Sequence, residues 1–293
     1  MYKRDMTSDQ FLSWENKAIT LMGMSGVGKT TLGNKLPGSS WYHYSGDYRL
    51  GTRYMDEAIL DNIKLEAMRV PFLAELLRTD SIYICHNITI NNLNPISSYL
   101  GKIGDPAKGG LDVDEFKARQ SLHMVAETAA MFDMEIFLKK AREVYGFAHF
   151  VNDAGGSLCE LGRDDVYEML ARRSLIVYLK ASDDMLDALI NRALVCPKPI
   201  YYRPEFLDQN LAEYLSSMHY ESSNEMDPDD FVRWIFPRLV KYRLPRYENV
   251  AAQYGVTIDA RRIQDLANEG QVIDLICEAL DAQVCQTVET LCR

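Results

Sequence analysis

The stretch Gly23-Met-Ser-Gly-Val-Gly-Lys29-Thr30 matches every fixed position of the pattern G-x-x-x-x-G-K-[ST]. Its glycines let successive backbone N–H groups turn toward one centre, while the Lys29 ammonium reaches the β- and γ-phosphates and the Thr30 hydroxyl can ligate Mg²⁺. The apolar run 18–22 before it is typical of a strand, and a helix beginning at Thr31 adds partial positive charge beneath the phosphates. The spacing therefore predicts a nucleoside triphosphate site with ATP and Mg²⁺ as cofactors. The residues expected to hold the nucleotide are Gly23, Ser25, Gly26, Val27, Gly28, Lys29, Thr30, Thr31 and Arg192.

Composition narrows the class of partner. The chain has 293 residues, of which 47% are hydrophobic and 25% charged, with a formal net charge of -10. This negative charge disfavours nonspecific attraction to nucleic acid or to an anionic membrane, so a small-molecule acceptor is the expected partner. The six cysteines include no C-x-x-C pair, so the sequence indicates neither a zinc site nor a disulfide framework, and we expect reduced thiols. With no apolar run long enough to span a membrane, we expect a cytoplasmic protein.

The elements that must position this chemistry alternate between strands and helices. Strands are predicted at 18–22, 41–45, 81–85, 147–151, 174–179 and 256–259, and helices at 54–77 with a break at Pro71, at 112–145, after Ser182 and at 272–280. The stretch 87–110 is rich in Asn, Gly, Ser and Pro, which predicts a long loop or flap. Alternation of this kind predicts an α/β fold with a parallel central sheet between two layers of helices. We expect a single domain over 1–293, with an inserted loop and helical segment at about 87–145 and a lid and helical segment at about 196–241.

Polar residues follow two of the predicted strands at their carboxyl ends, where ligands collect in parallel sheets. Asp47 follows the second strand and is placed to orient an acceptor hydroxyl. Asp153 follows the strand 147–151 and is the expected acidic partner of Thr30 at the metal, and the adjoining turn Gly155-Gly156 is expected to contact the acceptor. His43 has no companion at metal-ligand spacing, so we expect it to be structural.

A proline-rich segment follows the helix after the strand 174–179. Its three prolines, in Cys196-Pro-Lys-Pro-Ile-Tyr-Tyr-Arg203-Pro204, exclude regular helix, and its cations favour an anionic ligand. We interpret it as a lid that brings Arg203 to the transferring phosphoryl group, because a mobile arginine can neutralise charge on the phosphoryl oxygens. Arg192, near the end of the preceding helix, supplies a further positive charge.

These motifs, in this order, resemble the shikimate kinase and gluconate kinase group of P-loop phosphotransferases. The resemblance rests on the phosphate loop with its strand, Asp47, the turn Gly155-Gly156-Ser157, Arg203-Pro204, and the final Arg243-x-Pro-x-Tyr247 before Val-Thr-Ile-Asp259. It covers about half of the residues, in separated blocks. It implies the three-layer P-loop NTPase fold, with helical insertions.

The resemblance also implies roles. Asp47 would contact the acceptor hydroxyl, Arg203 the transferring phosphate, and Arg243 a carboxylate of the acceptor. The pair Gly46-Asp47 with Arg49 is similar to the Asp and nearby Arg of adenylylsulfate kinases, which makes Arg49 a further acceptor-binding candidate. Ser45 stands where shikimate kinases carry a second acidic residue, so the likeness does not extend to shikimate as the acceptor.

Three functions stay open at this point. The leading hypothesis is a kinase that moves the γ-phosphoryl group of ATP to a small polar acceptor, with Lys29, Asp47 and Arg203 as its catalytic residues. The first alternative is a nucleotide kinase or a kinase of nucleic-acid ends. The second is a regulatory P-loop ATPase or switch that has no small-molecule acceptor. The sequence leaves open the acceptor, the choice between ATP and GTP, and the oligomeric state.

Overall fold

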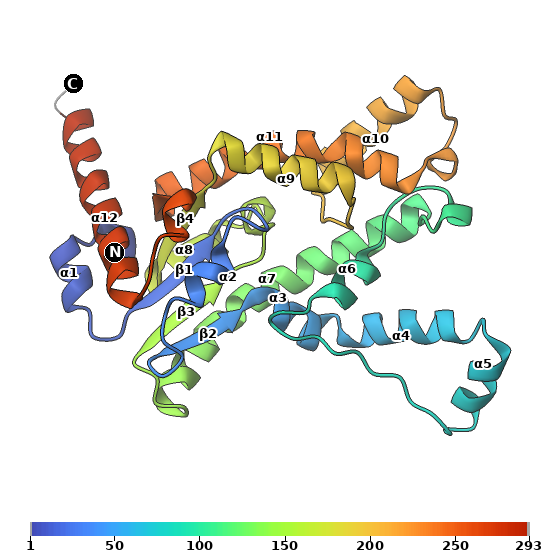
Figure 1. Ribbon diagram of the computed structural model, residues 1–293, viewed down its shortest axis with the longest axis horizontal. Coiled ribbons are helices and arrows are strands. Elements are labelled where there is room, and N and C mark those ends of the chain that lie inside the picture. Colours follow the sequence, from blue (N-terminus) through green and yellow to red (C-terminus); the bar gives the residue numbers. More distant parts are fainter. Residues whose placement is uncertain (1, 292–293) are drawn as a thin grey trace. The chain divides into compact units, whose positions relative to one another are not determined.

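The computed structural model describes residues 2–291, with side chains from 2 to 283. It has an α/β fold whose five strands form one parallel sheet in the order β2-β3-β1-β4-β5 (Figure 1). The strands are β1 (Ala18–Met22), β2 (Trp41–Ser45), β3 (His149–Asp153), β4 (Leu175–Lys180) and β5 (Gly255–Asp259). Every residue of β1 is buried, because β3 and β4 flank it on both sides. The predicted parallel sheet is confirmed, including the last strand at its edge.

Helices occupy the connections between the strands, precede the first strand and follow the last. They are α1 (Ser8–Ser13), α2 (Lys29–Gly33), α3 (Gly46–Arg49), α4 (Asp56–Ala67), α5 (Pro71–Arg78), α6 (Asn94–Leu100), α7 (Val113–Glu143), α8 (Asp164–Arg173), α9 (Asp183–Val195), α10 (Pro204–Met218), α11 (Pro228–Tyr254) and α12 (Glu269–Leu291). Pro71 and Pro204 each begin a helix, a position where the missing N–H of proline costs little. Pro71 thus separates α4 from α5, as the sequence predicted.

The chain divides into two compact units. Unit 1 contains the sheet and consists of the residues up to Gly46, Met131–Arg192, and the residues from Pro237 on. Unit 2 consists of Asp47–Ala130 and Ala193–Phe236 and includes most of both predicted insertions. Four helices, α3, α7, α9 and α11, contribute residues to both units. The single-domain organisation expected from the sequence stays a prediction.

In unit 1, alternation along the strands assigns two sets of side chains to opposite faces of the sheet. Tyr44, Asn152 and Thr20 are register partners and share one face. On that face Asn152 contacts the sulfur of Met131 in α7 at 3.9 Å. On the other face, Asp153 accepts a hydrogen bond from Thr30 of α2. The sheet therefore has helices on both faces, as the three-layer prediction requires.

Two predicted elements of unit 2 are wrong. The stretch 81–85 is not a strand, because among the described residues no neighbouring backbone pairs with it. The stretch 87–110 is not one long loop, since it contains α6 and a short turn of helix at Pro106–Lys108. In α6, Pro95 lies in the first turn, and two apolar side chains, Ile96 and Leu100, are buried.

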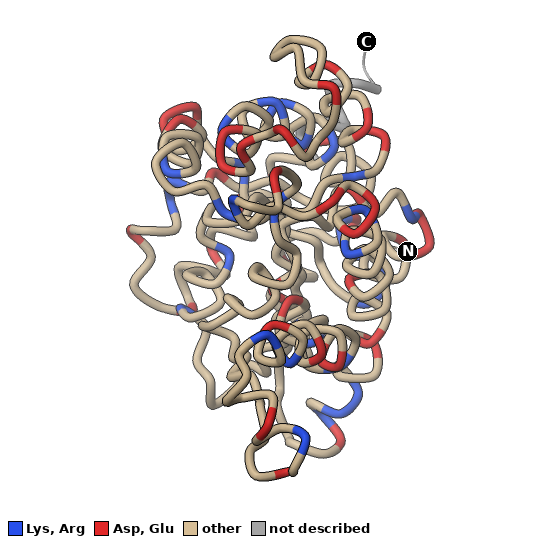
Figure 2. Tube along the Cα trace, turned by 90° about the vertical axis from the view of Figure 1, so that its right-hand side faces the viewer, with Lys and Arg blue, Asp and Glu red and all other residues tan. Residues whose placement is uncertain are grey.

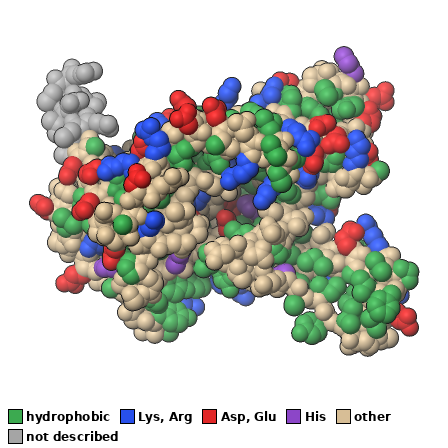
Figure 3. All heavy atoms as spheres, viewed as in Figure 1, with side chains coloured by type: hydrophobic (Ala, Val, Ile, Leu, Met, Phe, Trp, Pro, Cys, Tyr) green, Lys and Arg blue, Asp and Glu red, His purple; other side chains and the backbone are tan. Residues whose placement is uncertain are grey.

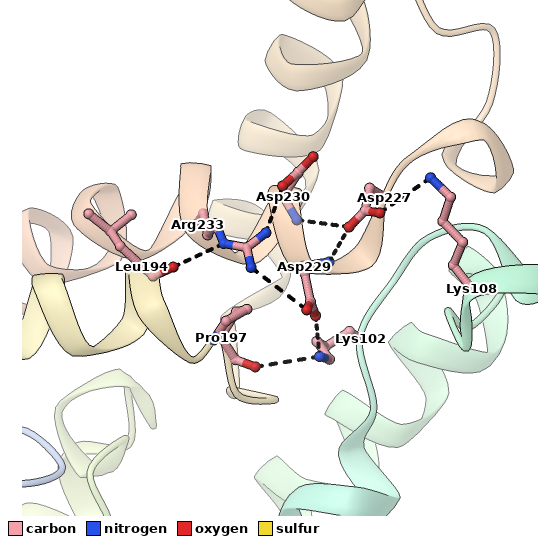
Figure 4. A network of polar contacts seen from close by, with 8 residues as sticks. All are labelled: Lys102, Lys108, Leu194, Pro197, Asp227, Asp229, Asp230 and Arg233. Carbon is pink, nitrogen blue, oxygen red and sulfur yellow. Dashed lines mark hydrogen bonds and ion pairs between the residues drawn. The ribbon is translucent and has the colours of Figure 1, made fainter.

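The start of the proline-rich segment is held by a polar network within unit 2 (Figure 4). Lys102 donates to the Pro197 carbonyl at 3.4 Å and pairs with Asp229. Arg233 donates to the Leu194 carbonyl at 3.0 Å. As predicted, 196–203 has no regular structure, but α10 begins directly at Pro204.

Charges of both signs are interspersed along the trace (Figure 2). The four cysteines whose side chains are described, Cys85, Cys159, Cys196 and Cys277, are free thiols. Cys285 and Cys292 lie outside the described side chains. Of the helices in the described part of the chain, none is both long enough and apolar enough to cross a membrane.

Candidate functional site

The loop after β1 has the backbone shape that phosphate binding requires. Gly23, Gly26 and Gly28 have φ values of 154°, 85° and 110°, which L-residues rarely adopt. The only backbone bond within the loop is from the Val27 N–H to the Met24 carbonyl at 3.2 Å. Among residues 2–291, the amides of Ser25, Gly26 and Gly28 donate to no backbone carbonyl. Their N–H groups are therefore available to an anion.

Lys29 lies inside the curve of this loop. Its side chain is buried, with the residue only 8% exposed, and Nζ donates to the carbonyls of Gly23 at 2.8 Å and Met24 at 3.2 Å. When a nucleotide binds, phosphate oxygens can replace these carbonyls as the acceptors of the hydrogen bonds from the Lys29 ammonium. Lys29 is also the first residue of α2, a helix of only five residues.

Thr30 and Asp153 meet at the base of the loop. The Thr30 hydroxyl donates to Oδ2 of Asp153 at 2.6 Å, and Asp153 is the last residue of β3. A hydroxyl and a carboxylate are the hard oxygen ligands that Mg²⁺ takes, so the donor set fits this ion. No three His, Cys, Asp or Glu residues gather into a metal cluster in the described part of the chain. A metal here would therefore complete its coordination with nucleotide oxygens and water, and when bound it would neutralise phosphate charge.

His43 also faces the Asp153 carboxylate, which sequence reasoning missed. Its Nε2 lies 4.0 Å from Oδ2 of Asp153 and, though buried, makes no hydrogen bond to the described residues. Burial lowers the pKa of His43, and the Asp153 charge offsets part of that shift. A Cβ on Gly33 of α2 would lie 2.9 Å from the His43 ring, so the ring fits here because residue 33 has no side chain. Strand alternation could have found the contact, because His43 precedes Ser45, the register partner of Asp153, by two residues.

The Gly155-Gly156 turn packs against the phosphate loop. A Cβ on Gly156 would lie only 3.0 Å from the Ser25 amide nitrogen, so a larger residue here requires the phosphate loop to shift by a few tenths of an ångström. The Tyr247 hydroxyl donates to the Gly156 carbonyl and thereby ties the turn to α11. The turn predicted to contact the acceptor thus borders the phosphate loop.

Arg192 lies over the same loop. A Cβ on Gly26 would collide with its Nη2 atom, which places the guanidinium directly above that glycine. The Arg192 side chain is exposed, and within the described residues no ion pair or hydrogen bond involves it. An arginine held there without a carboxylate partner can accept phosphate oxygens, consistent with the nucleotide role predicted for it.

Arg243 forms a buried ion pair with Glu160. Arg243 is 5% exposed and Glu160 is 0% exposed, and Nε of the arginine donates to Oε2 of the glutamate at 2.7 Å. Burial by itself lowers the pKa of Arg243, but the Glu160 carboxylate outweighs it and the net pKa is raised. The Arg243 guanidinium therefore stays charged. The ion pair fastens the segment after the Gly155-Gly156 turn to α11, and the acceptor role expected for Arg243 stays a prediction.

The remaining predicted residues belong to unit 2. Asp47 is the second residue of α3, directly after β2, and is half-buried. Arg49 lies over the Tyr54 ring at 5.8 Å from its centroid. Arg203 immediately precedes α10, and its Nε donates to Glu205 at 3.0 Å. Unit 1 by itself thus brings together Lys29, Thr30, Asp153, Gly156 and Arg192.

Among the comparisons with known proteins, the one with solved structures finds a distant likeness. No family model matches the chain, and no curated protein sequence matches it. A solved structure, a shikimate kinase from Bacteroides thetaiotaomicron, is similar with a TM-score of 0.37 and 15% identity, over 94% of this chain and 98% of that chain. At these values the likeness assigns the chain neither a family nor a function.

Proposed function

We propose that the protein is a phosphotransferase that uses ATP and Mg²⁺ and moves the γ-phosphoryl group to a small polar acceptor. The observation that carries the proposal is the gathering of Lys29, Arg192 and the Thr30–Asp153 pair around one glycine loop. Phosphoryl transfer needs little covalent chemistry from the protein. It needs positioning and neutralisation of the charge that spreads over the phosphoryl oxygens.

Each residue has a part in that neutralisation. Lys29 would hold the β- and γ-phosphate oxygens, and the loop amides would cradle the phosphates below it. Thr30 and Asp153 would hold the metal. Arg192 would approach from above Gly26 and bind the outer phosphates, and unlike Arg243 it has no carboxylate to give up first.

The acceptor side of the proposal rests on residues predicted from the sequence. Asp47 would orient the acceptor hydroxyl, Arg49 would bind the acceptor, and Arg203 would neutralise the transferring phosphoryl group. Arg243 would join Arg49 only by giving up its ion pair with Glu160. The acidic total charge of the chain favours a small molecule over a polynucleotide. Support for this half comes from residue type and order alone, so it is tested separately from nucleotide binding.

The test is release of ADP in the presence of candidate acceptors. Sugars, hydroxy acids, nucleosides and nucleoside monophosphates are supplied one class at a time with MgATP, and Lys29→Ala serves as the blank. Lys35→Ala is the matched control, since it removes the charge of a half-exposed lysine just after α2. We expect ADP release that requires one acceptor class, is lost in Lys29→Ala and persists in Lys35→Ala.

Two outcomes would contradict the proposal. ADP release at the same rate with no acceptor would fit a regulatory ATPase instead. An unchanged rate in Lys29→Ala would remove the phosphate loop from the chemistry. If an acceptor class is found, Asp47→Asn is expected to lower kcat with little change in ATP affinity, since its role concerns the acceptor.

A further inference from the structure

The segment between α5 and α6 has a backbone without partners. Among the described residues, the N–H and C=O groups of Ile82–His86 take part in no hydrogen bond. The flanking groups do: Ser81 N–H donates to the Leu76 carbonyl at 2.9 Å, and the Asn87 carbonyl accepts from Asn92 at 2.7 Å. The segment runs as a long extended trace back toward α6 (Figure 1). Five consecutive residues thus have backbone donors and acceptors that no other described residue satisfies.

The same segment has the side chains of a strand. Ile82, Ile84 and His86 are half-buried, while the residues between them, Tyr83 and Cys85, are exposed. This alternation is the pattern of a strand with one face on a core. The inner face is fastened, because His86 Nε2 lies 2.7 Å from Oδ1 of Asp56 in α4. The sequence prediction of a strand here was wrong only in that residues 2–291 provide no neighbouring strand.

The surface around this segment is apolar. A groove of about 470 Å³ lies between it and the helices α4 and α5 and is lined in part by Met68, Leu77 and Tyr83. Figure 3 shows hydrophobic side chains gathered over this part of the molecule. Large exposed apolar residues between the start of α4 and the end of this segment are Leu65 at 59%, Val70 at 47%, Phe72 at 68% and Tyr83 at 88%, of which Tyr83 lines the groove. An apolar patch of this kind, beside an unpaired strand edge, marks an interaction site.

The charges at its rim indicate the kind of partner. Lys64 pairs with Asp61 at 3.2 Å, and Arg69 pairs with Glu66 at 2.8 Å. Arg78 and Asp80 add one charge of each sign. A rim with both signs, largely paired already, gives no field to attract a polyanion or an anionic membrane. It suits a surface of the same composition, which is what a second copy of the chain presents.

We propose that Ser81–Cys85 pairs in antiparallel fashion with the same segment of a second copy of this chain. A two-fold axis at Tyr83 places Ile82 opposite Ile84 and Ser81 opposite Cys85. It also places Asp80 opposite His86, so no like charges face each other. The pairing gives the backbone groups partners, and the apolar surface of α4 and α5 adds the area that two short strands lack by themselves.

The first test is the mass of the protein in solution. Sedimentation equilibrium over about 1 to 100 µM covers the micromolar affinity expected of such an interface. We expect twice the chain mass for the wild type and the single-chain mass for Tyr83→Arg, which brings two cations together at the axis. Val125→Arg, at a residue of α7 that is 62% exposed and outside this surface, is the matched control and stays dimeric.

A single cooperative unfolding transition and unchanged ATP affinity of Tyr83→Arg show that the variant folds, and they keep this test separate from that of phosphotransfer. A wild type that is monomeric throughout the range would overturn the proposal. So would a Tyr83→Arg variant that remains dimeric.

The second test determines the register in which the two segments pair. Ser81→Cys places a thiol opposite Cys85 of the other copy, and oxidised glutathione then links the two chains covalently. The two thiols of one strand lie about 13 Å apart along an extended chain, too far to bridge each other. We expect a linked dimer with Ser81→Cys and none when Cys85→Ser is added. Linking through Cys85 alone, in the wild type, would indicate parallel pairing and contradict the antiparallel register.

Discussion

Replacing Glu160 by glutamine tests the buried ion pair that fastens the segment beside the phosphate loop. The change keeps the size of the side chain but removes its charge, so Arg243 is left buried without compensation. Both partners are at most 7% exposed at their side chains, which leaves little solvent screening. Removing one partner of such a pair costs about 3–5 kcal/mol of unfolding free energy.

A double variant separates the cost of leaving one buried charge unpaired from the cost of altered packing. Glu160→Leu combined with Arg243→Met removes both charges and keeps apolar volume, and replacement of a whole buried pair is about neutral or stabilising. We therefore expect a large loss of stability in Glu160→Gln and a much smaller one in the double variant. Urea unfolding followed by circular dichroism gives the free energies, provided that the denaturant slope stays unchanged.

A loss below about 1 kcal/mol in Glu160→Gln, the range of exposed pairs, would refute the reasoning. It would mean that Arg243 is not engaged by Glu160 in the folded protein. Arg243 would then be available to bind an acceptor, as the sequence resemblance implies. The measurement thus decides whether the arginine has a structural role at this position.

Three further predictions concern the site and the sheet. Gly156→Ala places a Cβ 3.0 Å from the Ser25 amide nitrogen, and we expect about tenfold weaker ATP binding by calorimetry, with unchanged affinity counting against the contact. Thr30→Val removes the hydroxyl that donates to Asp153, so Mg²⁺ should no longer strengthen nucleotide binding, whereas a full Mg²⁺ effect would exclude Thr30 as a ligand. Burial chiefly lowers the pKa of His149, so the unfolded chain binds more protons below the ordinary value of 6.5, and stability present above that pH is lost as pH falls. His149→Asn keeps an acceptor for the Lys17 N–H and should flatten this loss in denaturation curves at pH 7.5 and 5.5; an equal loss in both proteins would remove His149 as its cause.

Local patterns were sufficient to predict the sheet. The strands beginning at Ala18, Trp41 and Leu175 lie within a residue of their predicted starts, because apolar runs bounded by turn residues specify buried parallel strands. The prediction of a strand at 81–85 was wrong because a local pattern does not show whether a neighbouring strand is present. Its alternation is real, but pairing depends on a neighbour that local sequence cannot supply.

The candidate site shows the same division. The pattern ending at Lys29-Thr30 carries its chemistry in adjacent residues, so it could be found in the sequence. The contact between Arg243 and Glu160 joins residues that are 83 positions apart in the chain, so it could not be predicted from a local sequence pattern. Arg192 was predicted from its place near the end of a helix, but its position over Gly26 depends on how α9 packs.

The most direct test of the account is the affinity for MgATP, measured by calorimetry on the wild type, Lys29→Ala and Lys35→Ala. A charged hydrogen bond to phosphate contributes about 1.5–3 kcal/mol, which corresponds to a roughly ten- to hundredfold change in Kd. We predict that loss of affinity in Lys29→Ala and wild-type affinity in Lys35→Ala. Equal affinity in all three proteins would contradict the claim that the loop from Gly23 to Thr30 binds a nucleoside triphosphate.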